Sequence, residues 1–247
     1  MSEVPASLRN DTQSAVWEVE PRVPVAIRRQ EWRACMLAAV AGYADAYGLI
    51  HYQTFVSFMS GNTTQSGVNL GLAAWPAVVP TITAIVGFVG GAFSGTFLAH
   101  SPTRRSPGVR FGLAVLLMAG VIALTVESLA PTNLGIAMLS FAMGIMNTTM
   151  KAVGGQTVAL TYVTGTLNTL AQHLALGFRR IPLSDSQGSW DTQQHRALLL
   201  AGVWVSFLVG AAVSTAATMR TGVWVLLLPI VILTGFALFE GEPAQDG

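Results

Sequence analysis

The stretch FMSGNTTQSGVNL, residues 58–70, is strongly polar, yet it lies between two apolar segments of helical length, 34–54 and 77–99. Seven of the ten residues at positions 60–69 carry hydroxyl or carboxamide side chains. Each flanking segment is long enough to cross the roughly 30 Å hydrocarbon core of a bilayer. The sequence therefore places a polar cluster beside membrane-spanning helices, and the course of this cluster decides how the whole chain is arranged.

The composition is that of a membrane protein. Of 247 residues, 52% are hydrophobic and 10% are charged, whereas a soluble domain carries about 25% charged residues. Six apolar segments predict an all-α, polytopic membrane helix bundle: 34–54, 77–99, 111–130, 133–150, 197–219 and 222–239. The predicted organisation is a polar and disordered cytoplasmic tail (1–33), a single transmembrane domain (34–240) and a short C-terminal tail (241–247).

Several classes of function find no support in the sequence. A net charge of +1 gives no electrostatic attraction to nucleic acid. The single cysteine, Cys35, excludes an intramolecular disulfide and a cysteine-based zinc site. The sequence lacks a phosphate-binding loop, a zinc-protease motif and a nucleophile elbow. We therefore expect no metal, no cofactor and no enzymatic activity.

Two further segments, 57–74 and 157–177, have the length of helices but are rich in Ser, Thr, Asn and Gln. If both cross the membrane, the chain has eight crossings and 5 of its 13 basic residues lie outside. If both enter and return on one side, six helices cross and only Arg220 lies outside. Because Lys and Arg are enriched in cytoplasmic loops, the count favours six crossings with a cytoplasmic N-terminus. The eight-crossing arrangement remains the alternative.

The six-crossing arrangement has an internal symmetry. Its halves, 34–130 and 133–239, each contain a spanning helix, a polar re-entrant segment and two more spanning helices, in opposite orientations. The short motifs GYAD (42–45) and GIMN (144–147) precede SGN and TGT at similar separations. This is the pattern of a 3+3 inverted repeat, which many transporters contain.

Backbone that leaves helical geometry inside a bilayer must line a cavity or be buried in protein. Gly61 and Gly165 are candidate positions for such breaks, because glycine tolerates unusual dihedral angles. Ser, Thr and Asn also join membrane helices to each other, which is the alternative explanation for both clusters. The candidate substrate or ion pathway comprises Asp45, Ser60, Gly61, Asn62, Thr63, Asn147, Thr164, Gly165 and Asn168.

Asp45 is the only acidic residue well inside an apolar segment. An ionisable group in the bilayer usually faces the protein interior or an aqueous path. Its candidate partners are hydroxyls, carboxamides, His51 and the tyrosines Tyr43 and Tyr47. A proton-relay or cation-binding role and a structural, hydrogen-bonded role both remain open.

An Asp in a first helix of small residues, followed by FVSFMSGNTT and GVNLG within 55–71, resembles the YoaK-like family of multi-pass bacterial membrane proteins. The resemblance covers residues 32–240, and VTGTLNTLA is similar to a second block of that family. Ser60 replaces the usual Thr and keeps the hydroxyl. The resemblance carries over Asp45, Ser60, Gly61 and Asn62 in the first block, and Thr164, Gly165 and Asn168 in the second. It implies an inner-membrane location but no established activity.

Three hypotheses follow. The first is a transporter or channel for a small polar solute, with proton coupling through Asp45. The second is a membrane-embedded enzyme that acts on a lipid-like substrate, and the third is a non-catalytic partner or assembly protein. The expected partners are the lipid bilayer and an unidentified small polar solute.

Overall fold

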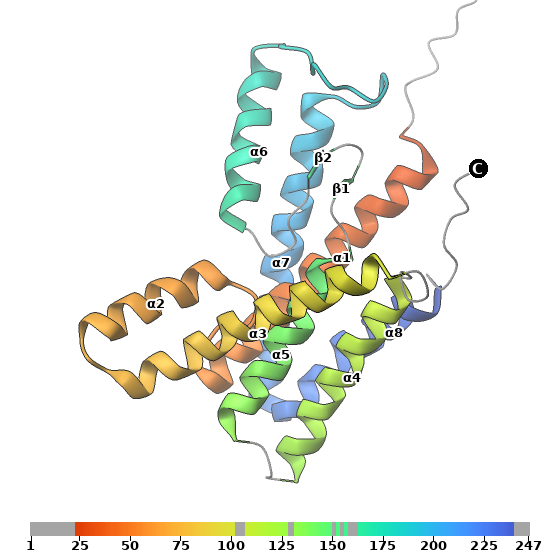
Figure 1. The fold of residues 1–247 in the computed structure, drawn as a ribbon. Helices are drawn as coiled ribbons and strands as arrows, with labels where there is room; N and C mark the ends of the chain where they lie inside the picture. Colours follow the sequence, from red (N-terminus) through yellow and green to blue (C-terminus); the bar gives the residue numbers. More distant parts are fainter. Residues whose placement is uncertain are drawn as a thin grey trace, which may run out of the picture.

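A computed structural model describes residues 23–101, 107–127, 131–149, 152–153, 156–157 and 163–239, which are almost entirely helical (Figure 1). The prediction of an all-α chain is confirmed there, apart from one short antiparallel pair of strands. The elements are α1 (Val25–Tyr52), α2 (Met59–Gly71), α3 (Trp75–Ala99), α4 (Pro107–Val126), α5 (Thr132–Asn147), β1 (Ala152–Val153), β2 (Gln156–Thr157), α6 (Val163–Phe178), α7 (Gln193–Thr221), a 3-10 turn (Gly222–Leu226) and α8 (Leu227–Phe239).

Three helical stretches are long and apolar enough to cross a membrane: α3, α4 and the 47-residue stretch Gln193–Phe239. The last contains two of the predicted segments, because the 3-10 turn beginning at Gly222, whose φ is 58°, separates α7 from α8. The predicted segment 133–150 corresponds to α5, an apolar helix of 16 residues.

The boundary of the N-terminal tail differs from the prediction. α1 begins at Val25, so the charged residues up to 33 form its first turns rather than part of a disordered tail. Residues 1–22 and the predicted tail 241–247 lie outside the described residues. The predicted polar segment 157–177 is helical from Val163 onward, and its positions 158–162 lie outside the described residues.

The six longer helices alternate in direction. The Tyr52 hydroxyl, at the end of α1, lies against Gly135 at the start of α5, so these two helices are antiparallel. α7 runs parallel to α1, since His195 and Glu31, near their starts, are 2.6 Å apart. Arg110, near the start of α4, donates to the Thr148 carbonyl just after α5. Phe111 of α4 stacks on Phe236 near the end of α8. Thus α1, α4 and α7 run one way and α3, α5 and α8 the other (Figure 1).

The two polar segments form short helices that pair with the next long helix. The Ser66 and Thr81 hydroxyls, 2.7 Å apart, join α2 to α3, and His173 Nδ1 lies 2.6 Å from Gln193 Oε1 between α6 and α7. At 1.5 Å per residue, the 13 residues of α2 and the 16 of α6 span about 20 and 24 Å. Both hairpins stand out from the bundle in Figure 1.

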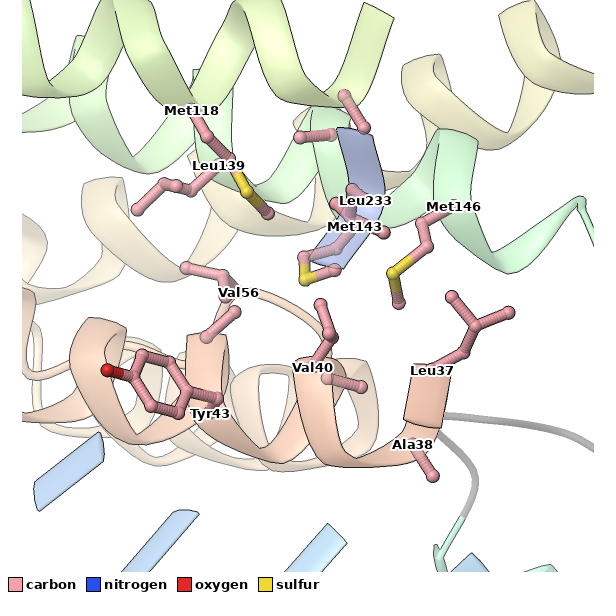
Figure 2. Close-up of a cluster of buried hydrophobic side chains, with 14 of the residues drawn as sticks. Leu37, Ala38, Val40, Tyr43, Val56, Met118, Leu139, Met143, Met146 and Leu233 are labelled. Atoms are coloured by element: carbon pink, nitrogen blue, oxygen red, sulfur yellow. The ribbon is translucent and has the colours of Figure 1, made fainter. Parts of the chain in front are cut away.

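The buried core lies between α1 and the layer formed by α4, α5 and α8. In Figure 2, Leu37 and Val40 of α1 face Met143 and Met146 of α5, with Met118 and Leu233 contributing from α4 and α8. Val56, which follows α1, reaches the same cluster and is fully buried. Methionine side chains adapt to irregular spaces, which suits a core assembled from four elements.

Two long interfaces are made by glycines that pack against a carbonyl of the opposite helix. Between α1 and α7, a side chain on Gly42 would overlap the Phe207 carbonyl oxygen, and one on Gly210 would overlap that of Ala39. Between α5 and α3, Gly144 meets the Phe88 carbonyl and Gly91 meets that of Phe141 in the same way. Small residues allow this close approach of helix backbones.

We predict that Gly210→Ala destabilises the protein by about 1–3 kcal/mol, because the new methyl group must displace the α1 backbone. Gly235→Ala is the matched control, since the space around Gly235 in α8 is open. The alanine there should be neutral or stabilising by up to about 1 kcal/mol. Thermal unfolding in detergent measures both; equal effects of the two substitutions would contradict the close packing.

Candidate functional site

Asp45 lies about two turns before the end of α1 and is 4% exposed. Its Oδ1 accepts the N–H groups of Val56 (2.8 Å) and Ser57 (2.6 Å), and its Oδ2 accepts the Ser57 hydroxyl (2.7 Å). α1 continues for seven residues beyond Asp45, about 10 Å. The chain after α1 must therefore turn back along the helix to reach this carboxylate.

This returning chain, residues 53–58, is called the return segment below. Asn62, in the first turn of α2, holds it from the other side: its Nδ2 donates to the Phe55 carbonyl (2.7 Å) and its Oδ1 accepts the Phe55 N–H (3.1 Å). Gly48 of α1 lets the segment approach, since a Cβ there would lie 2.8 Å from the Thr54 carbonyl oxygen. Asn62 thus binds the N–H and the carbonyl of Phe55, and Asp45 binds the N–H groups of the next two residues, Val56 and Ser57.

The position of the helix break differs from the prediction. Gly61 lies inside α2 and Gly165 inside α6, so neither residue interrupts its helix. The non-helical backbone precedes α2 instead, in the return segment. A side chain on Gly61 would overlap the Phe58 ring, which stacks edge-on against Phe55 with the ring centroids 5.1 Å apart. Gly61 therefore accommodates an aromatic ring rather than a break in the backbone.

A cavity of about 470 Å³, called the central cavity below, opens beside Asp45. It lies between α1, α7, the return segment and the start of α6, and it is lined by Gly42, Asp45, Ala46, Leu49, Ile50, Phe55, Phe58, Val163, Phe207, Leu208, Ala211, Ala212 and Thr215. Among the described residues that line it, only Asp45 and Thr215 contribute polar side chains. No group of three or more potential metal ligands occurs within the part of the chain that the structure describes.

The remaining predicted site residues are distributed over both short helices and α5. Ser60 and Thr63 lie on the exposed face of α2, where Thr63 donates to the Met59 carbonyl of its own helix. Asn147 is the last residue of α5. Thr164, Gly165 and Asn168 occupy the first turns of α6, next to Val163 at the cavity. Asp45 and Asn62 thus hold the same segment, whereas none of the other predicted residues lines the cavity.

The partners of Asp45 are not the aromatic residues next to it in the sequence. The Tyr43 hydroxyl donates to the Val225 carbonyl (3.0 Å), and the His51 ring packs on Tyr47 with centroids 4.4 Å apart. The hydroxyl that the sequence left unspecified belongs to Ser57. The other two donors are the main-chain N–H groups of Val56 and Ser57, which no residue type in the sequence could indicate.

The loop between α6 and α7, which its hydrophilic sequence suggests to be flexible, is held by Arg196. The guanidinium donates to both oxygens of Asp191 (2.8 Å each) and to Asp185 Oδ2 (3.1 Å). These hydrogen bonds keep the pKa of Asp191 below its ordinary value. The loop is therefore fixed to the start of α7 at the end of the bundle opposite α2.

We predict that Asn62→Leu destabilises the protein by about 2 kcal/mol or more, because the N–H and C=O of Phe55 lose their partners in a buried setting. Hydrogen–deuterium exchange of the 53–58 amides should accelerate with it. Asn168→Leu, on the exposed face of α6, is the matched control and should change neither quantity. Unchanged exchange in Asn62→Leu would show that the Asn62 side chain does not hold the return segment.

Comparisons with known proteins agree with the resemblance to the YoaK-like family and confirm it. The pattern of a family described as "Protein of unknown function (DUF1275)" matches residues 33–239. UPF0700 transmembrane protein RA0705 of Rhizobium meliloti (strain 1021) is 28% identical over 216 residues, covering 85% of this chain and 88% of the relative. UPF0700 transmembrane protein YoaK of Bacillus subtilis (strain 168) is 23% identical over 212 residues, covering 82% and 90%.

No solved structure matches the chain. The family match spans the return segment, both short helices and every long helix from the first buried turn of α1 to the end of α8. The chain therefore belongs to the DUF1275 family of transmembrane proteins.

Proposed function

We propose that this protein moves a small solute across the membrane, as a transporter or channel, by way of the central cavity. The observation that carries the proposal is the position of that cavity: the starts of both short helices, α2 and α6, border it through Phe58 and Val163. The far ends of these helices lie at opposite ends of the bundle, next to the starts of α3 and α7.

The lining of the cavity favours a particular kind of solute. Eleven of its thirteen residues offer only carbon or backbone to a ligand, while Asp45 and Thr215 supply the polar side chains. Such a site binds best a molecule with a compact apolar body and one polar or cationic group. We therefore propose a narrower substrate class than a fully polar solute.

An inverted repeat supports alternating exposure of this site. Gly42 and Phe207 in one interface correspond to Gly144 and Phe88 in the other, and the second pair of contacts lies three residues away in both cases. α1 and α5, the first helices of the two halves, run in opposite directions, as do α3 and α7. Transporters with such repeats exchange the conformations of their halves to open a central site to each side in turn.

The alternating directions of α1, α3, α4, α5, α7 and α8 support six crossings, with α2 and α6 entering and leaving on one side. In the eight-crossing alternative, α1 and α3 would run parallel. Tyr52 at the end of α1 and Ala77 near the start of α3 border the same pocket, which fits the antiparallel arrangement. We place the N-terminus in the cytoplasm because 12 of the 13 basic residues then lie inside.

Asp45 offers a way to couple movement to protons. An ionised carboxylate only accepts hydrogen bonds, and Asp45 accepts three from the return segment. When one oxygen is protonated it becomes a donor, so at least one of these bonds weakens. Protonation would thus loosen the return segment, which lies between the central cavity and the first half of α3.

We predict that Ala211→Phe lowers solute flux by about tenfold or more, the effect of roughly 1.4 kcal/mol on a barrier, because the ring fills the cavity. The measurement is uptake of labelled small amides, amines and organic cations into liposomes containing the purified protein. Ala216→Phe, on the exposed surface of α7, is the control and should keep the flux. Absence of flux across the whole panel with wild-type protein would contradict transport.

We predict that Asp45→Asn abolishes the pH dependence of this flux, since the carboxamide does not titrate. Asp185→Asn, which changes a 62% exposed carboxylate in the α6–α7 loop, should leave it intact. If Asp45→Asn fails to fold, Ser57→Ala serves instead: it removes one donor from the carboxylate and should displace the midpoint of the pH profile. An unchanged profile in a folded Asp45 variant would remove this residue from the coupling.

A further inference from the structure

A second pocket, of about 350 Å³, lies on the other side of the return segment and is called the polar pocket below. It is enclosed by the end of α1, by α2 and by the first half of α3, and it is lined by Tyr52, Gln53, Thr54, Gln65, Asn69, Ala77, Pro80 and Thr81. Its size falls within the range of small-molecule sites. Its lining is mainly polar, whereas the lining of the central cavity is mainly apolar.

Six of these eight described residues carry a hydroxyl or a carboxamide, and none of the eight carries a charge. The hydroxyls are largely occupied: Thr54 donates to the Tyr52 carbonyl (3.1 Å), and Thr81 bonds to Ser66 (2.7 Å). The carboxamides are not. Asn69 makes one long contact, 3.4 Å to the Ala77 carbonyl.

Gln65 is the most informative of these side chains. It is half-buried between α2 and α3 and has no hydrogen-bond partner among the described residues. A carboxamide has two donor hydrogens and an acceptor oxygen, so Gln65 can both donate to and accept from a molecule in the pocket. Gln53, at the rim, is likewise unbonded within the described chain and has a φ of 54°, which directs the backbone around the pocket.

We propose that the polar pocket binds a small uncharged molecule that both donates and accepts hydrogen bonds, with Gln65 and Asn69 as its principal contacts. Donors and acceptors are both present in the walls, so a ligand with only one kind would leave some of them unpaired. A charged ligand would enter a largely uncharged environment without a counter-charge, at a high cost in desolvation. Small amides and polyols have the required chemistry.

The pocket and the central cavity share a wall. Gln53 and Thr54 face the polar pocket, whereas Phe55 and Phe58 of the same return segment border the central cavity. A molecule bound in the polar pocket would therefore border the return segment that Asp45 holds, with the central cavity on the other side of that segment. Binding here is a property of α1, α2 and α3 and does not depend on transport.

The test measures protection of a cysteine placed in the pocket. In a Cys35→Ser background, the Ala77→Cys variant of the full chain is treated with methyl methanethiosulfonate in detergent, with and without acetamide or glycerol. Bound acetamide or glycerol should slow modification of the cysteine by the factor 1 + [L]/Kd, which is about fourfold when the ligand concentration is three times its dissociation constant. Acetate, the charged analogue of acetamide, should give no protection.

Three controls make the result specific. Gln65→Leu in the same background should cancel the protection, while Gln172→Leu, a matched change on the exposed face of α6, should keep it. A Thr63→Cys variant, exposed on α2 outside the pocket, should show no protection. Failure of both neutral probes to slow the Ala77→Cys reaction, equal protection by acetate, or protection that survives Gln65→Leu would each overturn the proposal. If Gln65→Leu does not fold, Asn69→Leu replaces it.

Discussion

The structure depends on one requirement: peptide groups buried in the bundle need hydrogen-bond partners even where the chain is not helical. The return segment is such a place, and its partners are side chains from the helices on either side. Asp45 takes the N–H groups of Val56 and Ser57, and Asn62 takes both polar groups of Phe55. With these contacts the chain can turn back beside α1 and begin α2 next to the central cavity. Without them it would have no way to do so in a low-dielectric interior.

The second determinant of the architecture is the pair of glycine interfaces. α1 packs closely on α7, and α5 packs closely on α3. Each of these two interfaces joins a helix of one half of the chain to a helix of the other half. The central cavity is thereby placed between the halves. This explains why the cavity beside Asp45 has walls from both ends of the sequence, Ala46 on one side and Ala211 on the other.

The sequence was sufficient to predict the helical class, five of the six apolar segments and the two residues, Asp45 and Asn62, that hold the return segment; α1, which contains the sixth segment, is not among the helices apolar enough to cross a membrane. It was insufficient where the partner is backbone, because a main-chain N–H leaves no trace in residue type. Gly61 was misleading for a related reason: small size can accommodate a neighbouring ring as well as an unusual dihedral angle, and only the position of Phe58 separates the two. The polar pocket could not be predicted, because its residues come from three helices and the hydrophobic periodicity of the sequence does not say how these helices pack together.

The unequal lengths of the long helices have a consequence for the lipid around them. α3 has 25 residues, about 37 Å, and carries exposed Phe93 and Phe97, whereas α5 has 16 residues, about 24 Å, and is mostly buried. The shorter helix is shielded by its neighbours and makes little demand on acyl-chain length. The longer one meets the acyl chains directly, so it must lie obliquely or extend into the headgroup region. Membrane thickness therefore acts on this protein more through α3 than through α5, and α3 also carries Gly91 and one wall of the polar pocket.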